Sequence, residues 1–205
     1  MWTRILGSLF ILSVISGCTT TSTMPPSQQA LTQSISERTR ELLRLNNWTV
    51  IGKIAFIQND KRESASINWQ NQGDKNQQRL DLTTFLGINI LHLNSKGSTH
   101  HIKVDGKEYN SDDLDGLIYQ LTGLTLPTEA LTYWLKGIPY LTGDQLSYDP
   151  VTKLPRNLTS YYDDHLWQIQ YDSYQLYGSK RLARKITIKQ SDLIIKIMLK
   201  DWIIK

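Results

Sequence analysis

The sequence predicts a mainly β protein (α+β), in which a curved antiparallel sheet forms an incomplete β-barrel with a helical lid. Three observations support this prediction. Short segments of alternating apolar and polar residues recur from Trp48 onward, polar or glycine-containing turns separate them, and two short helical segments interrupt them near the middle of the chain. A twisted sheet of many strands curls toward a barrel. The pattern alone fits a filled core and a hydrophobic ligand cavity equally well.

The composition is that of a globular protein with one sizeable domain. The chain has 205 residues, of which 40% are hydrophobic and 9% aromatic, and its formal net charge is +4. So small a surplus argues against nucleic acid as the main partner. After the first 17 residues no apolar run is long enough to cross a bilayer. We expect a single domain over residues 30–205, which functions as a monomer.

The N-terminus has the features of an exported and lipidated protein. Arg4 precedes an apolar run over residues 5–15, and the chain then reads Ser16-Gly17-Cys18. This pattern resembles the lipobox of bacterial lipoproteins, so residues 1–17 are predicted to be a signal peptide. Cys18 is the only cysteine and has no disulfide partner within the chain, which favours its lipidation over a chance cysteine after an ordinary signal. Residues 18–29 are then a lipidated N-terminus and flexible tether.

Three helices are expected. Leu31, Ile35, Leu42 and Leu45 recur near helical spacing, and Ser34 with Glu37 can form a capping box. A second helix is predicted after Ser111 as its cap, and a third after Thr128 as its cap, ending before Gly137 and Pro139. Their apolar positions are Leu114, Leu117, Ile118 and Leu121 in the second helix, and Leu131, Trp134 and Leu135 in the third.

The alternating segments are predicted to pair as meanders. The first five lie near residues 48–57, 65–70, 80–82, 88–93 and 101–104, with a hairpin turn at Asp105-Gly106 after the fifth. The later ones lie near residues 158–162, 166–171, 186–188 and 195–199. In the first segment Trp48, Val50, Gly52, Ile54 and Phe56 share one face. In the fourth, Ile88, Ile90 and His92 are placed opposite Asn89, Leu91 and Leu93.

The sequence contains none of the common catalytic signatures, so we expect no enzyme activity and no cofactor. His92, His100 and His101 lie close together, yet alternation directs the last two to opposite faces, and we predict solvated histidines and no metal site. Asp112, Asp113 and Asp115 are interpreted as first-turn charges at a helix N-terminus and not as acid–base groups.

The C-terminal stretch from residue 179 is strongly basic, with eight Lys or Arg against two Asp. One interpretation is attraction to anionic lipid headgroups or to an acidic protein. The other is the solvent face of two strands, because Lys185 and Lys189 alternate with Ile186 and Ile188.

The connection at residues 83–87 is unusual because it carries Phe85 and Leu86 beside Gly87, where a hairpin turn is normally polar. Either the strands continue and the glycine marks a bulge, or a large apolar side chain is exposed there. The residues themselves favour neither alternative.

Several stretches in this order resemble the LolB family. They are Trp48 with Gly52, the strand ending at Trp69, Leu86-Gly87, residues 121–123 through Leu126-Pro127, Leu131, Trp134, Gly137 and Pro139, then Trp167 with Tyr171, and the closing residues 201–205. LolB proteins are outer-membrane lipoproteins that receive other lipoproteins from the periplasmic carrier LolA. The resemblance departs at Phe85, where the family commonly has proline, and at residues 178–182, which lack a proline often found before the last strands.

The resemblance implies a hydrophobic cavity that takes lipoprotein acyl chains from LolA and delivers them to outer-membrane phospholipid. Leu86, with Phe85 and Gly87, corresponds to the family's protruding loop leucine, and Thr19 after the cysteine fits outer-membrane sorting. The expected cavity or lid residues are Trp48, Val50, Ile54, Trp69, Leu117, Leu121, Leu131, Trp134 and Trp167. The alternatives are a lipocalin-like lipoprotein that binds a small apolar ligand, a structural lipoprotein with a filled core and, last, an enzyme.

Overall fold

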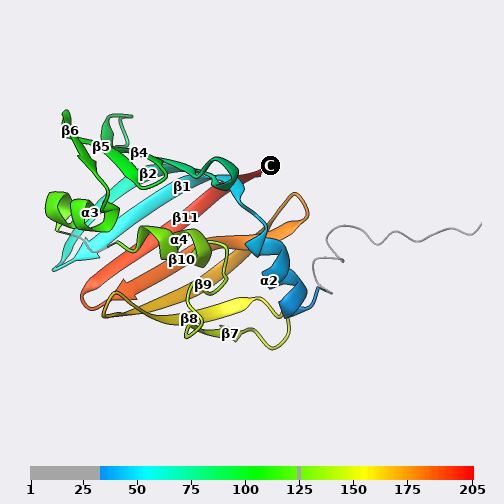
Figure 1. Cartoon of the computed structure of the whole chain (residues 1–205). Helices are drawn as coiled ribbons and strands as arrows, with labels where there is room; N and C mark the ends of the chain where they lie inside the picture. Colours follow the sequence, from blue (N-terminus) through cyan, green and yellow to red (C-terminus); the bar gives the residue numbers. More distant parts are fainter. Residues whose placement is uncertain (1–32, 124–125) are drawn as a thin grey trace, which may run out of the picture.

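A computed structural model describes residues 33–123 and 126–205 of the chain. The predicted signal peptide, Cys18, the predicted tether and Leu31 lie outside the described residues. The described part confirms a mainly β protein with a curved antiparallel sheet that is not closed into a barrel (Figure 1).

In the described part of the chain, eleven strands form a single sheet in two meanders. The first meander consists of β1 (Asn47–Gln58), β2 (Lys61–Gln72), β3 (Gln77–Thr83), β4 (Asn89–Lys96), β5 (Thr99–Val104) and β6 (Lys107–Ser111), with the 3-10 turn η1 (Gly73–Lys75) between β2 and β3. The second consists of β7 (Gln145–Tyr148), β8 (Pro155–Tyr162), β9 (His165–Tyr177), β10 (Lys180–Gln190) and β11 (Leu193–Ile204). The strand order is β6-β5-β4-β3-β2-β1-β11-β10-β9-β8-β7, so β6 and β7 are the two edges.

The meanders are joined where the first strand pairs with the last. β1 and β11 run antiparallel from Trp48 opposite Ile204 to Ile57 opposite Ile194, with a bulge beside Gly52. A side chain at Gly52 would collide with the carbonyl oxygen of Met198, so the close approach of the two backbones requires glycine there. Pairing the chain's first and last strands thus makes one continuous sheet of the two meanders.

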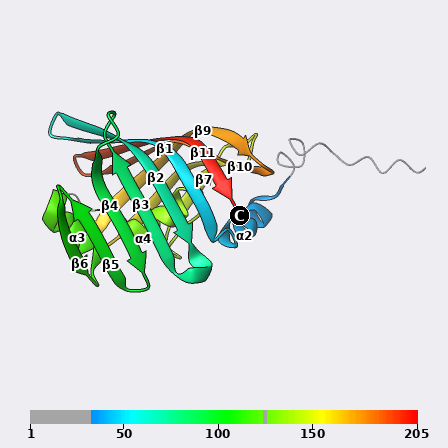
Figure 2. The same cartoon turned by 90° about the horizontal axis from the view of Figure 1, so that it is seen from above.

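The three helices of residues 33–123 and 126–205 lie on the concave side of the sheet and near one end of it (Figures 1 and 2). α2 (Ile35–Leu43) precedes β1 and begins with the predicted capping box, in which the Glu37 amide donates to the Ser34 hydroxyl and the Glu37 carboxylate accepts from the Ser34 amide. α3 (Leu114–Thr122) and α4 (Thr128–Trp134) connect β6 to β7. Because they join the two edges of the sheet, they cross its concave face.

Both predicted caps of α3 and α4 are wrong by one or two residues. Asp113, and not Ser111, is the N-cap of α3, and its carboxylate accepts from the Gly116 amide at 2.9 Å. The Ser111 hydroxyl instead accepts from the Asp113 amide in the preceding turn. At α4 the N-cap is Pro127, and Thr128 is the first helical residue. The Thr128 hydroxyl is engaged by another helix, as described below.

Candidate ligand cavity

A cavity of about 370 Å³ lies between the first meander and the helices α3 and α4. Its size falls in the range of ligand sites, about 300–1,000 Å³. It is lined by Ile54, Phe56, Glu63, Ser64, Ala65, Ile67, Trp69, Leu80, Leu82, Ile90, Leu91, Leu93, Ile102, Val104, Asp105, Ile118, Leu121, Thr122, Leu126, Thr128, Leu131, Ile195 and Ile197. Most of these side chains are aliphatic, so the space offers dispersion contacts and few hydrogen-bonding groups.

The cavity reaches the surface at one end of the sheet. Its exposed lining residues are Glu63, Ser64, Ile90, Asp105 and Thr122. The first four lie where β2 and β4 begin and where β5 ends, and the antiparallel register places these strand ends together. The deep wall is formed by Leu93 and Ile102, which are fully buried. An elongated apolar ligand would therefore enter at this end.

The cover of the cavity is shared by the two helices. α3 contributes Ile118 and Leu121, and α4 contributes Leu131. The carboxylate of Asp115 in α3 accepts from the Thr128 hydroxyl at 2.7 Å and from its amide at 3.2 Å. Burial raises the pKa of Asp115, against the opposing effect of these two hydrogen bonds. The bonds tie the start of α4 to α3, so the two helices form one unit.

The structure divides the predicted cavity and lid residues into two groups. Ile54, Trp69, Leu121 and Leu131 line the cavity. The residues that do not line it are Trp48, Val50, Trp134 and Trp167, which are buried in the main hydrophobic cluster, and Leu117, which is buried in a second cluster with Leu91, Leu93, Ile102, Leu114 and Ile118. Alternation on a strand shows which face a residue is on, but not which part of that face is hollow.

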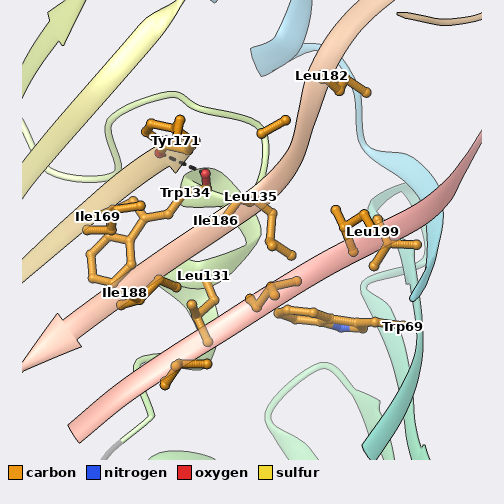
Figure 3. Close-up of a cluster of buried hydrophobic side chains, with 14 of the residues drawn as sticks. Trp69, Leu131, Trp134, Leu135, Ile169, Tyr171, Leu182, Ile186, Ile188 and Leu199 are labelled. Atoms are coloured by element: carbon orange, nitrogen blue, oxygen red, sulfur yellow. Dashed lines mark hydrogen bonds between the residues drawn. The ribbon is translucent and has the colours of Figure 1, made fainter. Parts of the chain in front are cut away.

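The other half of the concave face is filled. Trp134 of α4 packs against Trp167 of β9 with ring centroids 5.7 Å apart. The Tyr171 hydroxyl donates to the Trp134 carbonyl at 2.8 Å (Figure 3). Leu135 and Ile169 lie in the same cluster. Large aromatic side chains fill the space in this half, whereas the aliphatic side chains under α3 leave a cavity.

The connection between β3 and β4 exposes its apolar residues, and it projects beyond the strand ends (Figure 2). The Gly87 amide donates to the Thr84 carbonyl at 3.0 Å, and the Thr84 amide donates to the Ile88 carbonyl at 2.8 Å. Gly87 has φ +81°, a conformation that glycine adopts without strain. Phe85 and Leu86 occupy the tip and are exposed. The bulge alternative at Gly87 is wrong, because β3 ends at Thr83, β4 begins at Asn89 and the glycine closes the turn between them. The other alternative is confirmed, because the two apolar side chains are exposed.

A bulge in β4 was not predicted from the sequence. Leu82 pairs with Leu91 and Thr83 pairs with Asn89, so Ile90 is an extra residue without a partner on β3. Both Ile90 and Leu91 consequently border the cavity, whereas simple alternation placed them on opposite faces. The one signal in the sequence is the consecutive apolar pair Ile90-Leu91 in an otherwise alternating strand.

Comparisons with known proteins agree with this geometry. The family described as "Outer membrane lipoprotein LolB" matches residues 46–202. The chain belongs to the LolB family. An outer-membrane lipoprotein LolB of Aeromonas hydrophila is 36% identical over 97% of this chain and 96% of its own length. The LolB protein of Shewanella denitrificans is 30% identical over 98% of this chain and 93% of its own length.

The fold is shared with other solved structures at low sequence identity. A LolA superfamily protein from Nitrosomonas europaea superposes with a TM-score of 0.58 at 11% identity, over 87% of this chain and 93% of that one. A DUF1329 family protein from Desulfovibrio piger superposes with a TM-score of 0.57 at 8% identity, over 82% of this chain and 89% of that one. This chain therefore shares its fold with these two proteins.

In this LolB family member the three neighbouring histidines have separate partners. His92 is 2.6 Å from an Asp81 carboxylate oxygen, His100 is 2.8 Å from the Ser95 hydroxyl, and His101 is 2.8 Å from the Asn110 side-chain oxygen. Asp81 faces His92 across the β3–β4 pair, a proximity that local spacing does not reveal. Within residues 33–123 and 126–205, no group of three or more His, Cys, Asp or Glu could hold a metal ion.

The basic C-terminal stretch lies mainly on the outer face of the sheet. Lys185, Lys189, Lys196 and Lys200 are exposed on β10 and β11. Lys180 differs, since its ammonium forms an ion pair with Glu41 of α2. None of the helices in the described part of this family member is long and apolar enough to cross a membrane.

Proposed function

We propose that this LolB family member accepts lipoproteins from the periplasmic carrier LolA and inserts them into the outer membrane. Its cavity would hold the acyl chains of the cargo between the two steps. The observation that carries the proposal is the 370 Å³ apolar cavity, which opens at the end of the sheet that bears the Phe85-Leu86 loop.

The energetics of acyl chains explain why such a protein is needed. Each methylene moved out of water contributes about 0.8 kcal/mol, so a lipoprotein with several chains does not cross an aqueous compartment unescorted. A second cavity that matches the chains better than the first makes transfer favourable without nucleotide hydrolysis. The aliphatic wall of the cavity fits this use, because it contacts methylenes without demanding hydrogen bonds.

Two further parts of the chain have roles in the proposal. Lipidated Cys18 would anchor the mature protein in the outer membrane, and residues 18–29 would tether the domain on its periplasmic side. Leu86, flanked by Phe85 and Gly87, would enter the lipid phase during delivery. An exposed leucine at a loop tip is unfavourable in water and favourable in a bilayer.

The decisive experiment mixes the protein with a purified LolA–lipoprotein complex and phospholipid vesicles. We expect cargo to leave LolA, appear transiently on the protein and then sediment with the vesicles. Cys18→Ser should accept cargo and stay in the supernatant, because the anchor lies outside the domain.

Cargo that stays on LolA in the presence of the protein would contradict the proposal. Saturable binding of a fatty acid without any transfer of cargo would instead favour the lipocalin-like alternative. If neither a fatty acid nor cargo binds, the interior is closed to ligands and the structural alternative stands.

A further inference from the structure

The apolar residues of β4 and of the loop before it form a continuous series from the cavity to the surface. Their exposed fractions rise steadily, from 2% for Leu93 and 9% for Leu91 to 38% for Ile90 and 62% for Ile88. The series ends at the loop tip with Leu86 at 80% and Phe85 at 95%. A regular amphipathic strand would instead alternate between buried and exposed residues.

The bulge at Ile90 makes this series possible. Because Ile90 has no partner on β3, the strand presents Ile90 and Leu91 to the cavity in succession. Ile90 is at once part of the cavity wall and partly exposed to solvent. It is therefore the residue at which the interior of the cavity meets the outside along β4.

The other exposed residues that line the cavity are polar. Glu63 and Ser64 border it on β2, and Asp105 borders it at the turn between β5 and β6. An acyl chain that left past Glu63 or Asp105 would cover a carboxylate and remove it from water, which is costly without a partner. A chain that left past Ile90 and Ile88 would contact the exposed side chains of two isoleucines.

We propose that acyl chains leave the cavity along β4, over Ile90 and Ile88, toward the Phe85-Leu86 tip. The route leaves the cavity at Ile90, and this side chain positions the acyl chain for delivery. This inference rests on the proposed function and names the path by which it proceeds. The chain stays in contact with apolar surface from the cavity to the lipid phase, so the barrier to release is lowered.

The test measures release of a fluorescent palmitic acid from the full chain, anchored in phosphatidylcholine vesicles, into added acceptor vesicles. Ile90→Asn places an amide on the route, and a passing chain would have to cover it without a hydrogen bond. We expect release to slow about tenfold, which corresponds to about 1.4 kcal/mol in the barrier. Ile88→Asn, outside the cavity wall, should slow release in the same direction by less, and Ile90→Val should release at nearly the wild-type rate.

The matched control is Ile203→Asn, since Ile203 of β11 is 43% exposed and does not line the cavity. Its release rate should equal that of the wild type. Slower release would show that Ile90 lies on the exit route. If Ile90 only lined the cavity, the loss of apolar contact would weaken binding of the probe and speed its release. The thermal midpoint of each variant shows that the comparison is between folded proteins.

Three results would overturn the route. These are faster or unchanged release from both Ile90→Asn and Ile88→Asn, equal slowing in Ile203→Asn, and slowing that appears only in Glu63→Gln. Each leaves the proposed function in place as long as the wild-type chain takes up and releases the probe. A wild-type chain that takes up no palmitic acid would overturn both.

Discussion

The two halves of the concave face differ in what fills them. Under α4 the face carries Trp167 and Tyr171, and both are buried against Trp134 of that helix. Under α3 it carries Leu80, Leu82, Leu91, Leu93 and Ile102, and a cavity remains between them and the helix. The same sheet thus supports a solid core in one half and a ligand space in the other.

The two covering helices also differ in how they are fixed. The turn after α4 is held by α2, since the Arg38 guanidinium donates to the carbonyls of Lys136 at 3.2 Å and Gly137 at 3.3 Å. The buried Lys136 ammonium donates a hydrogen bond to the carbonyl of Leu45, which follows α2, at 3.3 Å. α3 meets the sheet through the apolar side chains Leu114, Leu117 and Ile118. Nondirectional contacts thus hold α3 to the sheet, and the Asp115 hydrogen bonds hold it to the start of α4.

The largest expected loss of stability comes from a substitution in the filled half of the concave face. Trp134→Ala should lower the free energy of unfolding by about 3–5 kcal/mol, because it removes a fully buried indole from a packed site. Leu82→Ala on the cavity wall should lower it by less than about 2 kcal/mol, since the side chain already borders empty space. Urea unfolding of both variants measures the difference. Equal losses would mean that the two halves are packed alike.

A matched pair of enlargements sharpens the same comparison. Ala183→Phe introduces a ring into the filled cluster and should lower the free energy of unfolding by about 1–3 kcal/mol through overpacking. Ala65→Phe introduces the same ring into the cavity wall, where space exists, and should cost less.

Fatty-acid binding should show the opposite order. Ala65→Phe should weaken it severalfold by occupying the cavity, and Ala183→Phe should leave it unchanged. Weakened binding in Ala183→Phe alone would place the ligand in the other half.

The buried Lys136 in the turn after α4 predicts that the free energy of unfolding depends on pH. Burial lowers the pKa of Lys136 to about 8, so the folded protein releases this proton before the unfolded chain does. The unfolded chain then binds more protons above pH 8, and the free energy of unfolding should rise by about 1 kcal/mol between pH 8 and 9 relative to Lys136→Met. Denaturant titrations of both proteins at each pH test this. Parallel pH profiles would show that Lys136 has the same pKa in both states.

The smallest expected change in stability belongs to the loop. Leu86→Glu should alter the free energy of unfolding by less than about 0.5 kcal/mol, since the side chain is exposed. Delivery of cargo to vesicles should nevertheless fail, because a carboxylate resists transfer into the acyl region. The control is Val151→Glu, an equally exposed apolar residue between β7 and β8. A loss of delivery in both variants would reflect added charge and not the loop.

Much of the fold followed from local patterns in the sequence. The alternation in β1, β2 and β9 to β11, the capping box of α2 and the positions of α3 and α4 were predicted because each depends on neighbouring residues. β7 was missed, as its four residues are too short to give a periodic signal. The caps of α3 and α4 were misplaced because Ser111, Asp113 and Thr128 are all good caps in isolation.

What the sequence determined by itself is the apolar face of each strand and the presence of Phe85 and Leu86 at a turn. What only the tertiary structure decided is which part of that face is hollow. Trp69 and Trp167 are both inward-facing tryptophans, yet one lines the cavity and the other fills the core. The difference arises from which helix crosses above each residue, and that depends on the pairing of β1 with β11, about 150 residues apart in the chain. The bulge at Ile90 is likewise a property of register between strands, and register is fixed only when the whole sheet assembles.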